Sequence, residues 1–154
     1  MTKTGLKIVA RNRRASHDYH LLDRFEAGIE LTGTEIKSVR SHNVNLRRGY
    51  VQVRDGELWL FDVHIAPYER AGYEKHDPDR PRKLLLHRRE INKIIGSITN
   101  KGLTMVPTKM YLKNGWAKVE VVLAKGKKQY DKRAALRKRD ADRQVERALR
   151  ERQR

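Results

Sequence analysis

Two β-hairpins constrain the fold more than any other feature of this 154-residue sequence. Their turns are Asp55-Gly56 and Asn114-Gly115, and both dipeptides tolerate the positive φ angles of a type I′ turn. The flanking segments are rich in aromatic and β-branched residues, and they cover residues 50–54, 57–61, 110–113 and 116–121. The sequence therefore predicts two antiparallel strand pairs.

Further elements are expected from the hydrophobic pattern. Apolar and charged residues alternate from Phe25 to Leu31, which indicates a strand, and residues 103–106 are expected to form another. Weak helical spacing predicts a short helix from Thr34 to Ser41, with Thr34 as its N-cap. Residues 1–16 are basic and polar around one short apolar run, so one interpretation is a solvated arm.

The middle of the chain combines an expected loop with an expected helix. Residues 68–83 hold two prolines, one glycine and many charges, and they are predicted to form a long mobile loop. Apolar positions at helical spacing predict an amphipathic helix over 84–98, which ends near Gly96 or continues to Gly102. About six short strands with two or three helices indicate a mainly β fold, an antiparallel β-barrel of OB-fold type.

The C-terminal residues differ in composition from the rest. From Lys125 onward there are 13 Lys and Arg residues against 5 Asp and Glu, which is about half of the +17 net charge. Ala141, Val145 and Leu149 form a narrow apolar stripe at helical spacing, but arginines repel one another along the same helix. We expect a body over 1–130 and a basic tail over 131–154 that is disordered when free and helical under some conditions. A merely solubilising tail is the alternative.

Composition also restricts the class of protein. An isoelectric point near 10.4 indicates a polyanionic partner. An anionic membrane is the less favoured partner, because the apolar residues of the tail are mostly Ala, with no Trp or Phe to enter a bilayer. No apolar run approaches the roughly 20 residues of a membrane span. The chain has no cysteine, which fits a cytosolic location. His17 and His20 bracket Asp18, but no further metal ligand at suitable spacing and no catalytic motif is evident, so we expect no enzyme activity, metal or cofactor.

Several residues are candidates for RNA contact. Asn12, Arg13 and Arg14 belong to a cationic block that is either solvated or bound to RNA. Glu26 either lies on a solvated strand face or accepts hydrogen bonds from base amino groups or a 2′-hydroxyl. Tyr130 either anchors the tail to the body or stacks on an unpaired base. Residues 125–128, Lys-Gly-Lys-Lys, are expected to form a phosphate-contacting turn.

Seven segments together resemble one known family. In order they are HDY, FEAGIEL, GTEIKSVR, DGELWLFDVHIAPYE, HDPDRPRKLLLHRRE, YLKNGWAKVEV and AKGKKQYDKR. The set is similar to the SsrA-binding proteins (small protein B) of bacterial trans-translation, and the resemblance runs from about residue 8 to 133. It implies an OB-fold barrel that binds the tRNA-like domain of transfer-messenger RNA, with a tail that becomes helical in the empty mRNA channel of a stalled 70S ribosome.

The resemblance also implies partners and site residues. The partners are transfer-messenger RNA, the small-subunit decoding centre and mRNA channel of the ribosome, and elongation factor Tu indirectly through the charged RNA, all in the cytoplasm without a membrane. The implied RNA-binding positions are Glu26, Leu85, His87 and Lys118, to which we add Asn12, Arg13 and Arg14. The implied contacts with the decoding centre are Lys125, Gly126, Lys127, Lys128, Tyr130, Asp131, Lys132 and Arg133.

Two other functions are compatible with the residues alone. A basic ribosomal or ribosome-assembly protein with an OB barrel would also carry a cationic extension. A nuclease or RNA-modifying enzyme could use His17, Asp18 and His20.

Overall fold

A computed structural model describes residues 6–68, 76–127 and 129–152, with the backbone alone over 129–136 and 151–152. The strands are β1 (Leu6–Arg11), β2 (Tyr19–Ile29), β3 (Val44–Asn45), β4 (Tyr50–Arg54), β5 (Glu57–Phe61), β6 (His64–Ile65), β7 (Arg82–Leu85), β8 (Thr104–Lys113) and β9 (Trp116–Gly126). The helices are α1 (Ala15–Asp18), α2 (Gly33–Arg40), α3 (Arg88–Lys101) and α4 (Gln129–Arg152).

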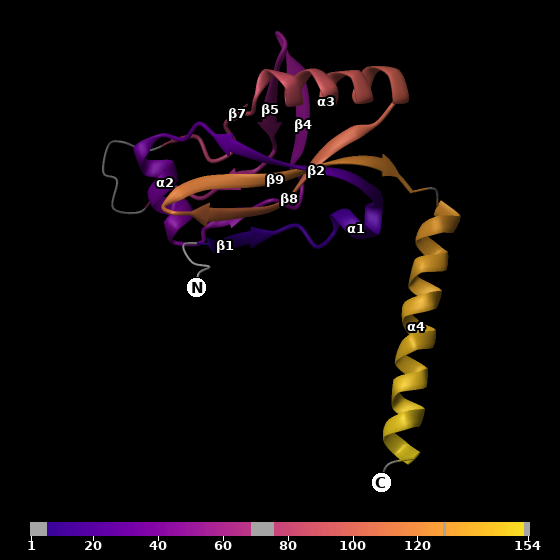
Figure 1. The fold of residues 1–154 in the computed structure, drawn as a ribbon. Coiled ribbons are helices and arrows are strands. Elements are labelled where there is room, and N and C mark those ends of the chain that lie inside the picture. The colour runs from indigo at the N-terminus through magenta and orange to yellow at the C-terminus, as the bar shows by residue number, and fades with distance from the viewer. Residues whose placement is uncertain (1–5, 69–75, 128, 153–154) are drawn as a thin grey trace.

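Six antiparallel strands close into a barrel. Their order is β8-β4-β5-β7-β2-β9, and β9 pairs again with β8, while β1 adds to the open side of β8 (Figure 1). A bulge between Pro107 and Lys109 bends β8, so its beginning pairs with β4 and its end pairs with β1. The fold is mainly β and confirms the predicted antiparallel barrel of OB type.

Both predicted hairpins are confirmed. Asp55 and Gly56 have φ angles of 53° and 73° between β4 and β5, and Asn114 and Gly115 have 51° and 84° between β8 and β9. These angles are the ones that a type I′ turn requires. The segments predicted separately at 103–106 and 110–113 are parts of the single strand β8.

The N-cap prediction for α2 is wrong. Thr32, not Thr34, caps the helix: its hydroxyl accepts from the Glu35 N–H, and the Glu35 carboxylate accepts from the Thr32 N–H at 2.8 Å. This reciprocal pair is a capping box, which the spacing Thr-x-x-Glu favours. Thr34 is buried instead, and its hydroxyl lies 2.9 Å from the His76 ring.

The predicted start of α3 is also wrong, because residues 84 and 85 belong to β7. Leu84 points into the core while Leu85 is exposed, and the pair lies opposite Ile29 and Gly28 of β2. The helix begins at Arg88 and ends before Gly102, whose φ of 64° is a left-handed C-cap. The end at Gly102 was one of the two that the sequence allowed.

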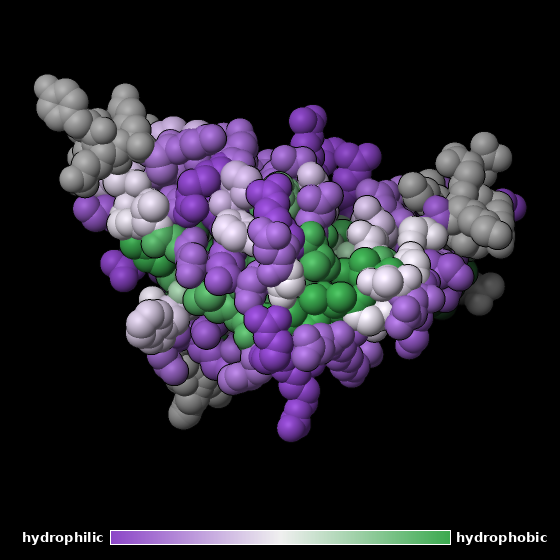
Figure 2. Space-filling model, turned by 90° about the horizontal axis from the view of Figure 1, so that it is seen from above, coloured by the Kyte–Doolittle hydropathy of each residue, from purple (hydrophilic) through white to green (hydrophobic). Residues whose placement is uncertain are grey.

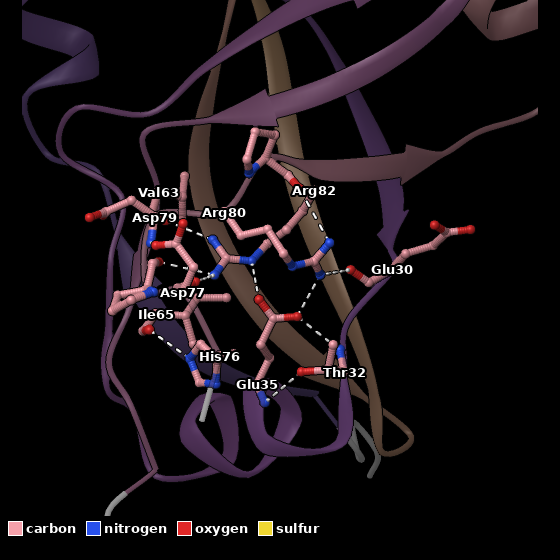
Figure 3. Close-up of polar contacts among 12 residues, drawn as sticks. Glu30, Thr32, Glu35, Val63, Ile65, His76, Asp77, Asp79, Arg80 and Arg82 are labelled. Atoms are coloured by element: carbon pink, nitrogen blue, oxygen red, sulfur yellow. Dashed lines mark hydrogen bonds and ion pairs between the residues drawn. The ribbon is translucent and has the colours of Figure 1, made fainter. Parts of the chain in front are cut away.

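A buried ion-pair cluster holds the segment before β7 in place (Figure 3). Glu35 accepts from Arg82 Nε and from Arg80 Nη2, each at 2.6 Å. Arg82 also donates to the Val63 carbonyl oxygen at 2.7 Å, and His76 Nε2 lies 2.9 Å from the Ile65 carbonyl oxygen. Residues 76–83 are therefore fixed to α2 and the barrel, so the predicted mobile loop is wrong over this part. Residues 69–75 lie outside the described residues.

The interpretation of residues 1–16 as a solvated arm is wrong for β1. This strand pairs with β8 from Leu6 opposite Lys113 to Arg11 opposite Lys109, and Val9 is buried in the core. Val9 and Ala10 of its apolar run pack against the core at this edge of the barrel.

The core lies inside the barrel and under two helices. Val39 of α2 and Ile91 and Ile94 of α3 join the inward side chains of the strands. A second, smaller cluster lies outside the barrel, where Ala15 of α1 packs on Val106 and Ala124. Viewed from above, hydrophilic residues cover most of the visible surface on both sides of an apolar band (Figure 2).

Helix α4 projects away from the barrel as a single rod (Figure 1). It begins at Gln129, two residues before the predicted start of the tail, and runs for 24 residues. Val145 and Leu149 of its apolar stripe are exposed. Disorder of the free tail stays a prediction. In the described part of the chain, every helix is too short or too polar to cross a membrane.

Candidate nucleic-acid interface

The outer surface of the barrel around Glu26 is built by strand alternation. Phe25, Ala27 and Ile29 point toward the core, so Glu26 and Gly28 face outward. Gly28 lies opposite Lys118 on β9 and opposite Leu85 on β7. The Lys118 and Leu85 side chains therefore lie on the two sides of β2, at the level of Gly28.

Strand β8 completes this surface on the far side of β9. Tyr111 lies opposite Lys118, and Lys109 lies opposite Glu120, which is itself opposite Glu26. We call the surface the Glu26 face. Its residues are Glu26, Leu85, Lys109, Tyr111, Lys113, Lys118 and Glu120.

Gly28 lets Leu85 stand close to β2. A Cβ atom at position 28 would lie 3.2 Å from the Leu85 Cβ, which is tighter than ordinary van der Waals contact. Leu85 remains 47% exposed, although a leucine gains free energy from burial. The Glu26 face therefore offers an apolar contact beside its charges.

Hydrogen bonds hold Glu26 as a carboxylate. The Tyr111 hydroxyl donates to Glu26 Oε2 at 2.5 Å, and Lys113 Nζ lies 3.4 Å from both carboxylate oxygens. The hydrogen bond from Tyr111 and the charges of Lys113 and Lys118 lower the pKa of Glu26 against the opposing effect of burial. Burial, followed by the bond to Glu26, raises the pKa of Tyr111. The pair can thus present acceptor oxygens at a fixed place between cations.

The second acidic residue of this face is engaged with other cations. Glu120 Oε1 accepts from Arg24 at 3.0 Å, and its Oε2 lies 3.2 Å from Lys109 Nζ. Lys113 and Lys118 are the cations whose charges act on Glu26, as expected of a face that attracts phosphates.

The structure brings together three of the predicted RNA-binding residues, namely Glu26, Leu85 and Lys118. His87 is close in sequence, since it follows Leu85 by two positions, and it is the exposed N-cap of α3. Its backbone N–H lies 3.4 Å from Glu90 Oε1. His87 therefore stands at the edge of the barrel that carries Leu85.

Asn12, Arg13 and Arg14 lie at a different part of the barrel. The Asn12 side chain donates to the Pro107 carbonyl oxygen at 3.0 Å, and its backbone N–H donates to the Thr108 carbonyl oxygen at 2.7 Å. These contacts are at the bulge of β8, whereas Glu26 contacts the end of that strand. Here Arg13 and Arg14 line a hollow together with Arg47, a cation that the sequence analysis did not single out.

The start of the tail is fixed to α1. Lys125 and Gly126 pair with His20 and Tyr19 at the end of β9. Lys127 donates its backbone N–H to the Asp18 carbonyl oxygen at 3.0 Å and its ammonium to the Ser16 carbonyl oxygen at 2.9 Å. Lys128 and the side chains of Tyr130, Asp131, Lys132 and Arg133 lie outside the described residues.

The histidine segment forms a local ion pair. His17 Nδ1 lies 2.9 Å from Asp18 Oδ1, and Arg14 Nε lies 3.8 Å from the other oxygen of the same carboxylate. Among residues 6–68, 76–127 and 129–152, no three His, Asp or Glu side chains converge as metal ligands.

Sequence reasoning did not assign a role to Tyr111 or Lys113. A signal was present, because strand alternation before the Asn-Gly turn places both on the outer face beside Lys118. Their contact with Glu26 depends on the pairing of β2 with β9, which the sequence does not state.

The fold and this face together define a class, the basic OB-type barrels that offer cations, a carboxylate and apolar side chains to a nucleic acid. A family model described as SmpB protein matches residues 9–151. The chain belongs to the SmpB protein family.

Individual relatives agree. The SsrA-binding protein of Roseiflexus sp. (strain RS-1) is 58% identical over 149 residues, which cover 96% of this chain and 94% of that protein. The SsrA-binding protein of Carboxydothermus hydrogenoformans is 56% identical, with coverage of 95% and 98%. A solved structure described as "tmRNA-SmpB: a journey to the center of the bacterial ribosome" matches with a TM-score of 0.67 and 44% identity, over 87% of this chain and 96% of that one.

Proposed function

We propose that this protein binds the tRNA-like domain of transfer-messenger RNA and delivers it to stalled ribosomes for trans-translation. Membership of the SmpB family supports this, as do the name of its relatives and the ribosomal setting of the matched structure. The protein acts as an RNA-binding factor in the cytoplasm and not as an enzyme. It meets elongation factor Tu indirectly, through the charged RNA.

The observation that carries the proposal is the Glu26 face. A folded RNA offers phosphates, 2′-hydroxyls and the edges of unpaired bases. Lys113 and Lys118 attract phosphates, while Glu26 accepts from base amino groups or a 2′-hydroxyl. Leu85 adds apolar contact at the side of the same surface. In this proposal His87 extends the face, and Asn12, Arg13 and Arg14 contact RNA from the separate hollow beside Arg47.

The tail is responsible for the second part of the proposed function, the contact with the ribosome. Residues 125–128 and 130–133 contact the small-subunit decoding centre, and the remainder of the tail occupies the empty mRNA channel. The channel is lined by phosphates, which neutralise the repulsion between arginines and favour the helix. Folding of the tail is then coupled to its arrival on the ribosome. The anchored root at Lys127 supports a fixed exit point for the tail.

The test replaces Glu26 and measures affinity for the isolated tRNA-like domain. We expect Glu26→Ala to weaken binding about ten- to a hundredfold, because a hydrogen bond to a charged group contributes about 1.5–3 kcal/mol. Glu26→Gln should bind at an intermediate level, since it keeps one acceptor oxygen and loses the charge. Thermal stability should change little because Glu26 is exposed.

The matched control is Glu30→Ala on the same side of the barrel. The Glu30 side chain is exposed, and Arg80 contacts this residue only through the Glu30 backbone carbonyl oxygen, which alanine keeps. Glu30→Ala should bind RNA normally. A large fall in melting temperature of the Glu26→Ala variant, with unchanged RNA affinity, would make Glu26 a structural residue and refute the proposal.

A further inference from the structure

Trp116 is the most exposed large hydrophobic residue in the described part of the chain. Its surface is 74% accessible, although tryptophan has more apolar area to bury than any other side chain. It is the first residue of β9, directly after the Asn114-Gly115 turn. The proposed RNA contacts of Glu26, Leu85 and Lys118 do not involve this ring.

Trp116 lies in a paired strand, next to a lysine that contacts Glu26. Its cross-strand partner is Lys113, whose ammonium lies 3.4 Å from Glu26. Lys118 follows Trp116 by two residues on the same strand and so points to the same side of the sheet. Cross-strand partners have Cβ atoms about 5 Å apart. The indole thus continues the Glu26 face to the tip of the hairpin.

A shallow hollow lies between this hairpin tip and the start of α2. Its volume is about 510 Å³, and Leu31, Ile36 and Trp116 line it together with Arg40. Leu31 and Ile36 are partly buried against the core, whereas Arg40 is exposed. The hollow therefore has an apolar floor, an aromatic wall and a cation.

We propose that Trp116 is a stacking platform for one unpaired nucleobase of the RNA bound on the Glu26 face. This inference rests on the proposed function and adds a recognition element to it. Aromatic side chains bind unpaired bases through the π-face, and nearby cations hold the attached phosphates. Lys113, Lys118 and Arg40 surround the indole with positive charge, which favours RNA over an apolar protein segment. Paired bases inside a helix cannot present a free face, so the base must come from a loop or bulge.

Tryptophan fluorescence reports on this contact directly. The chain has two tryptophans, and the other is Trp59, which is half-buried on β5 opposite Lys83. In a Trp59→Phe variant, the emission therefore comes from Trp116 alone. We expect titration with the tRNA-like domain of transfer-messenger RNA to quench this emission and to saturate with binding measured by filter retention. A Trp116→Phe variant, which keeps Trp59, should show little quenching.

Affinity measurements separate stacking from structure. Trp116→Ala should weaken RNA binding about tenfold, while Trp116→Phe should stay within about threefold because phenylalanine still stacks. Both variants should melt close to the unchanged protein, since the ring is exposed. A fully paired RNA hairpin stem should bind Trp116→Ala and the unchanged protein equally.

The outcomes are distinguishable. If RNA binds and Glu26→Ala weakens binding, but Trp116 emission does not change and Trp116→Ala binds normally, the inference about Trp116 is wrong and the proposed function survives. If the unchanged protein does not bind the tRNA-like domain, the proposed function and this inference both fail.

Discussion

Glu35 is a single buried residue that holds several segments of the fold together. It is fully buried and joins three parts of the chain, the Thr32 cap, Arg80 and Arg82 (Figure 3). Burial opposes ionisation, but hydrogen bonds from these three partners outweigh it and lower the pKa of Glu35 to about 2. Removing one partner of such a buried ion pair is strongly destabilising, because it leaves an uncompensated charge in the core.

The stability of the fold should therefore depend on pH in the acid range. A carboxylate with a depressed pKa stabilises the folded state above its unfolded pKa of about 4.5, and this contribution is lost as pH falls toward 2. The difference corresponds to roughly 3 kcal/mol. We expect Glu35→Gln to destabilise the protein by about 3–5 kcal/mol at pH 7, because Arg82 loses its buried counter-charge.

The measurement is urea unfolding at several pH values between 2 and 7. In Glu35→Gln the decline from pH 4.5 to 2 should be shallower than in the unchanged protein. Glu30→Gln, which alters an exposed carboxylate, should follow the unchanged protein. An equal pH slope in both variants would show that other carboxylates dominate acid unfolding.

At the scale of elements, local chemistry could be predicted from the sequence and long-range pairing could not. The two hairpin turns and the Gly102 cap follow from residues that accept positive φ, and all three are present. The boundary between β7 and α3 was missed because Leu84 and Leu85 also fit a helical spacing. Only pairing with β2 and β5 makes them a strand, and this pairing is remote in sequence.

Two glycines with equally open surroundings should respond oppositely to alanine. A Cβ atom at Gly115 or at Gly96 meets nothing within 4 Å, but Gly115 has a φ of 84° whereas Gly96 lies in the middle of α3. Gly115→Ala should lower stability by about 1–2 kcal/mol through backbone strain. Gly96→Ala should raise stability by about 0.5–1 kcal/mol because alanine favours the helix.

Thermal unfolding followed by circular dichroism checks both variants. A stabilising Gly115→Ala would mean that the hairpin turn relaxes out of its positive φ angles. Loss of stability in Gly96→Ala would show that α3 needs flexibility at its centre.

At the scale of the whole molecule, positive charge is divided between the barrel and the tail. Residues 125–154 hold 13 of the 36 Lys and Arg residues but little hydrophobic surface, and the barrel holds the rest around a core. The tail composition and several site residues could be recognised in the sequence. The strand register places Glu26, Leu85 and Lys118 on one surface. This register could not be predicted from the sequence, so the shared surface is known only from the folded barrel.

Truncation after Tyr130 tests this division of labour. Affinity for isolated transfer-messenger RNA and its dependence on salt should be nearly unchanged, since each phosphate contact to the barrel remains. Peptide tagging on stalled ribosomes should be abolished. Val145→Pro should act in the same direction, because proline in a helix interior costs about 3 kcal/mol, whereas Val145→Ala should stay active.

The readout is peptidyl transfer on reconstituted ribosomes with no codon in the A site. Full transfer by the Val145→Pro protein would show that the tail acts as a charged thread whose helix is incidental. Loss of most RNA affinity on truncation would contradict the assignment of the tail to the ribosome.

The two hydrogen bonds from Lys127 to α1 fix the point at which the tail leaves the barrel. With 24 residues, α4 is about 36 Å long. A tilt of about 10° at its root would sweep the free end through about 6 Å, close to the length of one helical turn. Once the tail is helical in the mRNA channel, the angle at which the barrel sits on its RNA therefore limits where the far end of the tail can lie.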